Sequence, residues 1–107
     1  MDYTFFVSLA NEISLPEKGI LSNVVHKDEY VNITAFGFAA GQELSSHSAP
    51  TPVALYFFEG EADVRLGDDT VITHGGSFVY MPPLLVHGIC AISSVKMLLI
   101  QIKTTAK

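Results

Sequence analysis

The sequence predicts a single all-β domain, either a sandwich or a barrel, and three observations lead to this prediction. Apolar and polar residues alternate with a period of two in several short segments, which is the pattern of half-buried strands. Turn residues (glycine, proline and aspartate) recur at the spacing of about ten residues that is typical of these folds. No segment after residue 20 has helical periodicity. We therefore expect little or no helix outside the first 20 residues.

The first predicted strand covers residues 29–38. Val31, Ile33 and Ala35 share one face of it, and Asn32 and Thr34 share the other. Side chains in a strand point alternately to the two faces of the sheet. The apolar residues are therefore expected on the buried face.

The remaining strands follow in chain order. Residues 53–58 are all apolar, so both faces of this strand are expected to be buried. Strands over 62–66 and 70–74 are expected to pair as a hairpin, because the turn residues Gly67-Asp68-Asp69 separate them. The last three predicted strands are 77–81, 86–92 and 95–102.

Length and composition limit the domain organisation and the class of protein. A chain of 107 residues forms one domain. We expect residues 1–20 to form an N-terminal arm that packs on the barrel or on a partner subunit, and residues 21–107 to form the barrel domain. The apolar fraction of 49% argues against disorder. No apolar run is as long as a membrane helix, and no signal peptide is evident.

Charge and cysteine content point to a cytoplasmic protein without a nucleic-acid partner. The formal net charge is −5 and Arg65 is the only arginine, so there is no basic patch for nucleic acid or anionic lipid. Cys90 is the single cysteine, which excludes an internal disulfide and fits a reducing cytoplasm. Cys90 is expected to be a core residue.

Two histidines stand at the spacings of a known pair of motifs. Gly41 is followed after five residues by His47, and this segment ends at Gly60; Gly76 is followed by Pro82 and then His87. These stretches resemble the two signature motifs of the cupin superfamily. The resemblance covers roughly residues 29–102 and implies a single cupin-type double-stranded β-helix, or jelly-roll barrel, of the small microbial type.

The resemblance also implies a metal site, which this sequence keeps only in part. In the family, two histidines and a glutamate of the first motif, together with the histidine of the second, bind one divalent metal such as Fe, Mn, Ni or Zn. Here Ala49 and Val53 stand at two of the ligand positions. Only His47 and His87 remain. Glu43 is a weak candidate for a third ligand, because it precedes His47 by four residues and would share its face in a regular strand.

The remaining residues predict a largely apolar pocket with two imidazoles at one end. Such a site suits a small, partly apolar organic molecule with one or two polar groups. The expected pocket residues are His47, Ala49, Val53, Leu55, Phe57, Tyr80, His87 and Ile89.

Three functions are compatible with these residues. The first is a non-catalytic binder of a small organic molecule. The second is a metal-dependent enzyme, similar to the cupin dioxygenases or isomerases, with His47, His87 and a recruited third ligand. The third is a partner-binding module in which the barrel is only a scaffold. Catalytic residues, if there are any, are not identified by the sequence.

The apolar residues also predict a homodimer. In the strand 53–58, Leu55 and Phe57 are expected to fill the barrel, while Tyr56 and Phe58 face outward and need cover. Each aromatic side chain offers about 150–250 Å² of surface for burial. A second subunit is the expected cover.

Overall fold

The computed structural model describes residues 1–103 and confirms the predicted all-β fold. A single 3-10 turn, η1 (Leu9–Glu12), precedes nine strands. The strands are β1 (Ile20–Lys27), β2 (Val31–Phe38), β3 (Glu43–His47), β4 (Val53–Glu59), β5 (Ala62–Leu66), β6 (Asp69–Thr73), β7 (Phe78–Met81), β8 (His87–Ala91) and β9 (Val95–Ile102). Strands β1 and β3 were not among the predicted strands.

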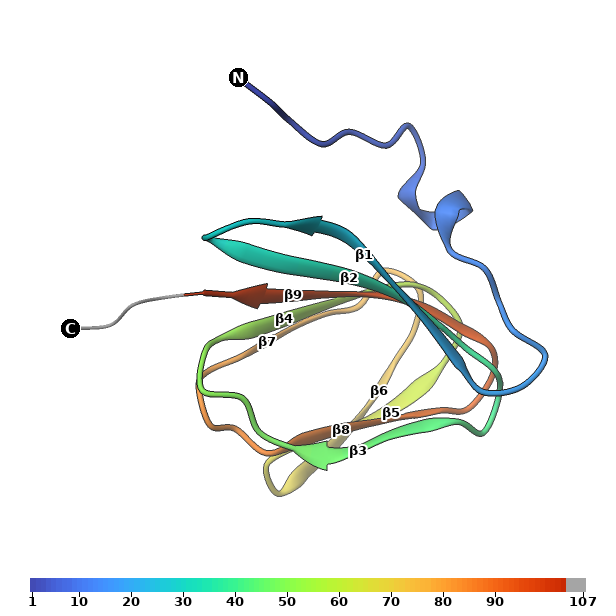
Figure 1. The fold of residues 1–107 in the computed structure, drawn as a ribbon. Helices are drawn as coiled ribbons and strands as arrows, with labels where there is room; N and C mark the ends of the chain where they lie inside the picture. Colours follow the sequence, from blue (N-terminus) through green and yellow to red (C-terminus); the bar gives the residue numbers. More distant parts are fainter. Residues whose placement is uncertain (104–107) are drawn as a thin grey trace.

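The strands form two antiparallel sheets that face each other across the core (Figure 1). The five-stranded sheet has the order β1-β2-β9-β4-β7, and the four-stranded sheet has the order β3-β8-β5-β6. Apart from the hairpins β1-β2 and β5-β6, neighbouring strands in both sheets come from distant parts of the chain, as in a jelly roll. The predicted hairpin is confirmed as β5 and β6, which pair from Leu66↔Asp69 to Ala62↔Thr73.

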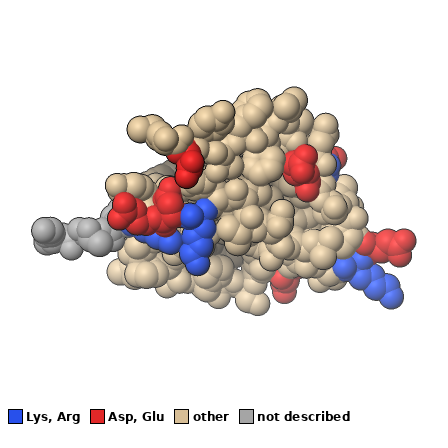
Figure 2. All heavy atoms as spheres, turned by 45° about the horizontal axis from the view of Figure 1, so that its top comes forward, with Lys and Arg blue, Asp and Glu red and all other residues tan. Residues whose placement is uncertain are grey.

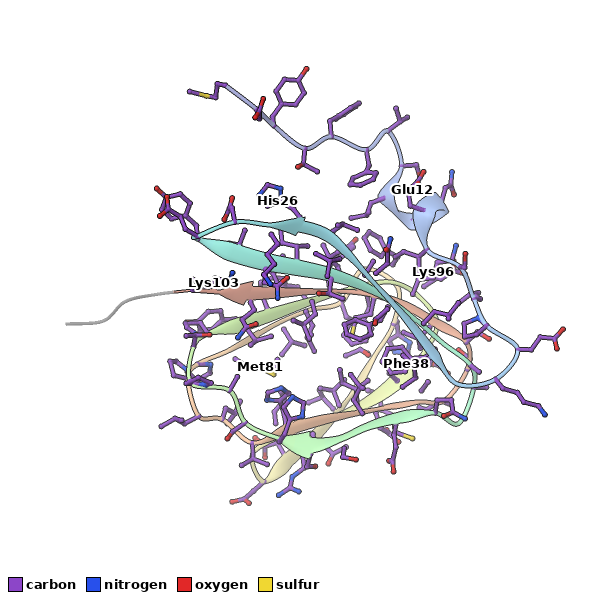
Figure 3. The ribbon with its side chains drawn as sticks, in the orientation of Figure 1. Glu12, His26, Phe38, Met81, Lys96 and Lys103 are labelled. Carbon is purple, nitrogen blue, oxygen red and sulfur yellow. The ribbon has the colours of Figure 1, made fainter. Side chains whose placement is uncertain are left out.

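The core lies between the two sheets. Its largest fully buried side chains include Phe38, Leu55, Phe57, Met81 and Met97. Figure 3 shows Phe38 and Met81 in the space between the sheets, toward opposite ends of the barrel. The middle of the barrel is therefore packed with side chains.

The N-terminal arm crosses the outer side of the five-stranded sheet (Figure 1). Ile13 is buried there against Gly37 of β2, where an added Cβ would collide with the backbone oxygen of Ser14. The Lys96 Nζ atom of β9 donates a hydrogen bond to the Ala10 carbonyl, at 2.9 Å. Glycine at position 37 thus allows the arm to approach the sheet closely.

In strand β2, the face that was predicted to be buried in the core is the outer face of the sheet. Phe36 and Phe38 pack in the core, so Asn32 and Thr34, which are in phase with them, also point toward the interior. Ala35 lies on the outer face beneath the arm and is buried there. The predicted alternation of apolar and polar residues in β2 was correct. The apolar residues, however, lie on the outer face of the sheet, where the arm covers them, and not inside the barrel.

In the described residues, 1–103, no helix is long and apolar enough to span a membrane.

Candidate functional site

The structure brings His47 and His87 together at one end of the barrel. They are register partners on the neighbouring strands β3 and β8, and their ring centroids are 4.4 Å apart. His87 is only 4% exposed, whereas His47 is exposed. The pair therefore extends from the buried interior to the molecular surface at this end of the barrel.

Backbone hydrogen bonds orient both imidazoles in the same way. The His47 Nδ1 atom lies 2.8 Å from the Ser45 carbonyl oxygen, and the His87 Nδ1 atom lies 2.9 Å from the Leu85 carbonyl oxygen. A carbonyl only accepts hydrogen bonds, so each Nδ1 must carry the hydrogen. In the neutral rings, both Nε2 atoms keep a lone pair that can accept a hydrogen bond.

Glu43 lies on the other face of β3, which corrects its assignment as a companion of His47. A register shift between Leu44 and His47 breaks the alternation of the strand. Leu44 packs against the core, so the neighbouring Glu43 points outward. There it lines a surface cavity of about 140 Å³ together with Arg65 and Cys90 of the four-stranded sheet.

Most of the apolar residues that were predicted to line the pocket lie inside the barrel, but some of them are buried more deeply than a pocket wall would be. Val53 and Ile89 are buried near the histidine end, and Ala49 packs against the core from its half-buried position. Leu55 and Phe57 are fully buried in the packed core. They form the floor beneath the site and not the wall of an open cavity.

Tyr80 lies outside the barrel, contrary to the expectation that it lines the pocket. It is 54% exposed and stands between Val79 and Met81, which are both buried. Because side chains alternate along β7, Tyr80 must face away from the core. This residue belongs to the outer face of the five-stranded sheet.

The structure adds polar residues that sequence reasoning missed. Asn32 and Gln101 are register partners and lie in the same row as Val53 and Met81, at the histidine end. The Gln101 Nε2 atom donates to the Thr51 hydroxyl at 3.4 Å. The Asn32 Oδ1 atom is buried and has no hydrogen-bond partner among residues 1–103. One pattern in the sequence could have predicted this. Asn32 and Thr34 share a strand face with Phe36 and Phe38, so a buried Phe38 places Asn32 on the inner face as well.

The residues at this end do not form a complete metal centre. An open catalytic site generally needs about three protein ligands, and here His47 and His87 are the two imidazole donors. Within residues 1–103, no group of three or more His, Cys, Asp or Glu side chains is placed to hold one ion. The described donor set therefore does not fit a three-ligand metal site.

The other two histidines lie elsewhere. His26 of β1 bridges the arm to a turn: its Nδ1 atom is 2.7 Å from the Thr4 hydroxyl, and its Nε2 atom is 2.7 Å from the Asp28 carboxylate. It is thus more than a solvated turn residue. His74 is largely exposed and lies 3.1 Å from the Glu61 carboxylate.

The backbone explains the glycines of the two motifs. Gly41, Gly60 and Gly76 all have positive φ angles, of 85°, 91° and 95°, which side chains disfavour. At Gly60, a Cβ would also collide with the Ser94 backbone oxygen. Leu84 has a φ of 71°, although it carries a side chain.

Comparison with solved structures places this architecture among known folds. A conserved protein of unknown function from Streptococcus pyogenes has a TM-score of 0.87 and 24% identity, covering 99% of this chain and 93% of its own. A cupin superfamily protein from Desulfitobacterium hafniense has a TM-score of 0.85 and 25% identity, covering 90% and 88%. An RmlC-like cupin from Desulfovibrio desulfuricans has a TM-score of 0.76 and 24% identity, covering 96% of both chains. No family model and no curated protein matches the sequence.

Proposed function

Because the chain has the fold of the single-domain cupins, we propose that it binds a small organic molecule at the open end of the barrel, between His47 and Asn32. The ligand rests on the apolar floor of the barrel and donates hydrogen bonds to the polar groups at this end, of which His47 is exposed and His87 and the Asn32 Oδ1 atom are buried. Catalysis is not part of this proposal.

The orientation of the two imidazoles carries the proposal. Each Nδ1 hydrogen is used by a backbone carbonyl, so the Nε2 atoms of neutral His47 and His87 are hydrogen-bond acceptors. The Asn32 Oδ1 atom is a third acceptor, and it is buried without a partner in the part of the chain that the structure describes. Leaving such an acceptor unpaired costs about 1–3 kcal/mol, which a ligand donor would offset.

These acceptors define the chemical class of the ligand. A molecule with hydroxyl, amine or amide N–H groups can satisfy them. An apolar body would pack against buried residues such as Val53, Met81 and Ile89. We therefore expect small neutral or cationic alcohols and amines to bind in preference to purely apolar compounds of the same size.

The test is a fragment screen of small alcohols and amines, followed by protein-observed NMR. We expect fragments to shift the imidazole resonances of His47 and His87. The variant His47→Leu should weaken binding about tenfold, because it removes one acceptor. His47 is exposed, so this variant is expected to fold.

The matched control is His74→Leu, a substitution at a histidine distant from the barrel end. It should bind the same fragments as the unchanged protein. The proposal fails if fragments bind equally to His47→Leu, or if no fragment perturbs the imidazoles of His47 and His87.

A metal-dependent enzyme, dioxygenase-like or isomerase-like, is the second candidate function. It is favoured by the backbone carbonyls that hold each Nδ1–H, since metal-binding histidines use such contacts to fix their orientation. The incomplete donor set would have to be extended by a ligand from outside the described residues, such as one from a partner subunit. Elemental analysis of the purified protein separates the candidates. One tightly held ion per chain, lost in His47→Leu, would establish the metal and overturn the proposal that the two Nε2 atoms accept hydrogen bonds from an organic ligand.

A further inference from the structure

We propose that the outer face of the four-stranded sheet carries a second binding site, in which a small α-amino acid is held between Arg65 and the carboxylates of Glu43 and Asp63. This site is separate from the end of the barrel and does not depend on the function proposed there. It rests on a surface cavity, on the three charged side chains that line it, and on the lack of a direct contact between the opposite charges.

The register of the strands places the two carboxylates on either side of Cys90. Cys90 of β8 is the register partner of Glu43 on β3 and of Asp63 on β5. Its chain neighbours Ile89 and Ala91 are buried in the core, so Cys90 itself points outward. Side chains that are paired in register lie on the same face of a sheet. The three residues therefore form one row across the outer face.

The next row of the same face contains an open position. Arg65 of β5 pairs with Gly88 of β8. A strand rises by about 3.3 Å per residue, so this row lies about 7 Å from the row of the carboxylates. Gly88 contributes no side chain, and an added Cβ would come within 2.9 Å of the Ser46 hydroxyl oxygen. The space over Gly88 is the cavity of about 140 Å³ that Glu43 and Asp63 also line.

The charges around this cavity are not paired with each other. The Arg65 Nε atom donates a hydrogen bond to the Gly67 carbonyl at 2.9 Å, and a second guanidinium nitrogen lies 3.4 Å from the Ser46 hydroxyl. A guanidinium has five N–H donors, so others remain available. Within residues 1–103, neither Arg65 nor the two carboxylates take part in an ion pair. A molecule that carries both signs of charge can fill the space between them.

This face differs in charge from the side of the molecule that carries the arm. The four-stranded sheet lies opposite the arm (Figure 1). Figure 2 shows the arm side, where broad areas of uncharged residues separate scattered charged side chains. In the four-stranded sheet, Asp63 and Arg65 lie on β5 and Cys90 lies on β8, which are the two central strands. The charges of the cavity are thus set at the centre of a sheet face and not at its edge.

The size and the charges of the cavity define the class of ligand. Sites for drug-sized molecules have volumes of about 300–1,000 Å³, so a cavity of about 140 Å³ admits only a few non-hydrogen atoms. A guanidinium binds a carboxylate through two parallel hydrogen bonds, and an ammonium group donates up to three hydrogen bonds to carboxylate oxygens. An α-amino acid carries both groups on one carbon atom. We therefore expect glycine or alanine to bind in preference to molecules that carry a single charge.

The first test is an NMR titration of the ¹⁵N-labelled full chain with glycine, and separately with methylamine and with acetate. We expect glycine to shift the backbone amide of Cys90 and the side-chain Nε–H of Arg65, with a dissociation constant in the millimolar range. Methylamine and acetate should each bind about tenfold more weakly, because each lacks the charged hydrogen bonds of one side of the site.

The variants test charge and space separately. Arg65→Gln should weaken glycine binding about tenfold for the same reason. Lys18→Gln is its matched control, because it removes the same charge from an exposed residue that does not line the cavity. Arg65 is exposed as well, so both variants should fold, and circular dichroism checks this. Cys90→Phe should abolish binding by filling the cavity without changing a charge, whereas Cys90→Ser should bind glycine as the unchanged protein does.

Equal binding of glycine by Arg65→Gln and by Lys18→Gln would overturn the proposal. Binding of acetate or methylamine as tight as that of glycine would overturn it too, and so would full binding by Cys90→Phe. Glycine that shifts only the imidazoles of His47 and His87 has bound at the barrel end, which would contradict this site and leave the proposed function standing.

Discussion

At the scale of single residues, the two histidines that stand at the spacings of the motifs lie next to each other in the folded chain. His47 and His87 are 40 positions apart in sequence, yet their rings stand 4.4 Å apart between β3 and β8. The same backbone geometry recurs at both: each Nδ1 bonds to the carbonyl two residues earlier. This shared orientation could not be read from the motif.

Leu84 provides a prediction about backbone strain. Its φ of 71° lies in the left-handed region that favours glycine, and its side chain is 70% exposed. A left-handed conformation costs a side-chain-bearing residue about 1–2 kcal/mol, while glycine adds about 0.4–1 kcal/mol of unfolded-state entropy. We expect Leu84→Gly to raise the free energy of unfolding by about 0.5–1 kcal/mol in a urea titration.

Val86→Gly is the control for this prediction. Val86 is partly exposed in the same loop and does not have a positive φ. Glycine there should lower the free energy of unfolding. If both variants lower it equally, Leu84 is not strained.

Asp28 provides a prediction about pH. The hydrogen bond from His26, followed by those from the backbone N–H groups of Val31 and Tyr30, lowers the pKa of Asp28 from 3.8 to about 2. A carboxyl with a depressed pKa stabilises the fold above its unfolded pKa, and this contribution disappears as the pH falls through the folded pKa. Asp28→Asn should therefore melt at a lower temperature than the wild type at pH 5, and the difference should shrink between about pH 4 and pH 2. An NMR titration that places the Asp28 pKa near 3.8 would contradict this.

At the scale of elements, simple alternation predicted the wrong face for residues of both β3 and β2. In β3, the irregularity between Leu44 and His47 sends Glu43 to the outer surface. In β2, the alternation is regular, but the arm covers the face that carries Ala35. Polar side chains of β2 are thus left facing the interior, where Asn32 becomes part of the proposed binding site.

Asn32 of β2 is expected to affect both the free energy of unfolding and the binding of the ligand. Its Oδ1 atom is buried and finds no hydrogen-bond partner in the described residues, and an unpaired buried polar atom is destabilising. Replacement by the similarly shaped leucine, Asn32→Leu, should raise the free energy of unfolding by about 1 kcal/mol. The same variant should bind the alcohol and amine fragments more weakly.

The control is Asn23→Leu, at an exposed position of β1. Its effect on unfolding should stay within about 0.5 kcal/mol. Chemical denaturation measures both variants. A loss of stability in Asn32→Leu would mean that the amide is satisfied in the folded protein, for example by bound water.

At the scale of the whole molecule, the apolar excess of the sequence is divided between two places. One is the packed core between the sheets, where Phe38, Leu55 and Phe57 are fully buried. The other is the outer side of the five-stranded sheet and the arm above it, where Phe5, Phe78 and Tyr80 are exposed. The expectation that Tyr56 and Phe58 face outward agrees with their positions on β4, out of phase with Leu55 and Phe57. The homodimer expected from the sequence stays a prediction, and a second subunit on this side would cover these side chains.

The sequence by itself determined the all-β class, the hairpin of β5 and β6, and the positions of His47 and His87 at the spacings of two motifs. These follow from local spacing, because alternation and turn residues act over only a few positions. The tertiary structure alone decided which face of β2 looks inward, where Glu43 and Tyr80 point, and that Asn32 joins the histidines. The physical reason is that a period of two shows which residues share a face, but only the packing of arm, sheets and bulge determines which face is buried.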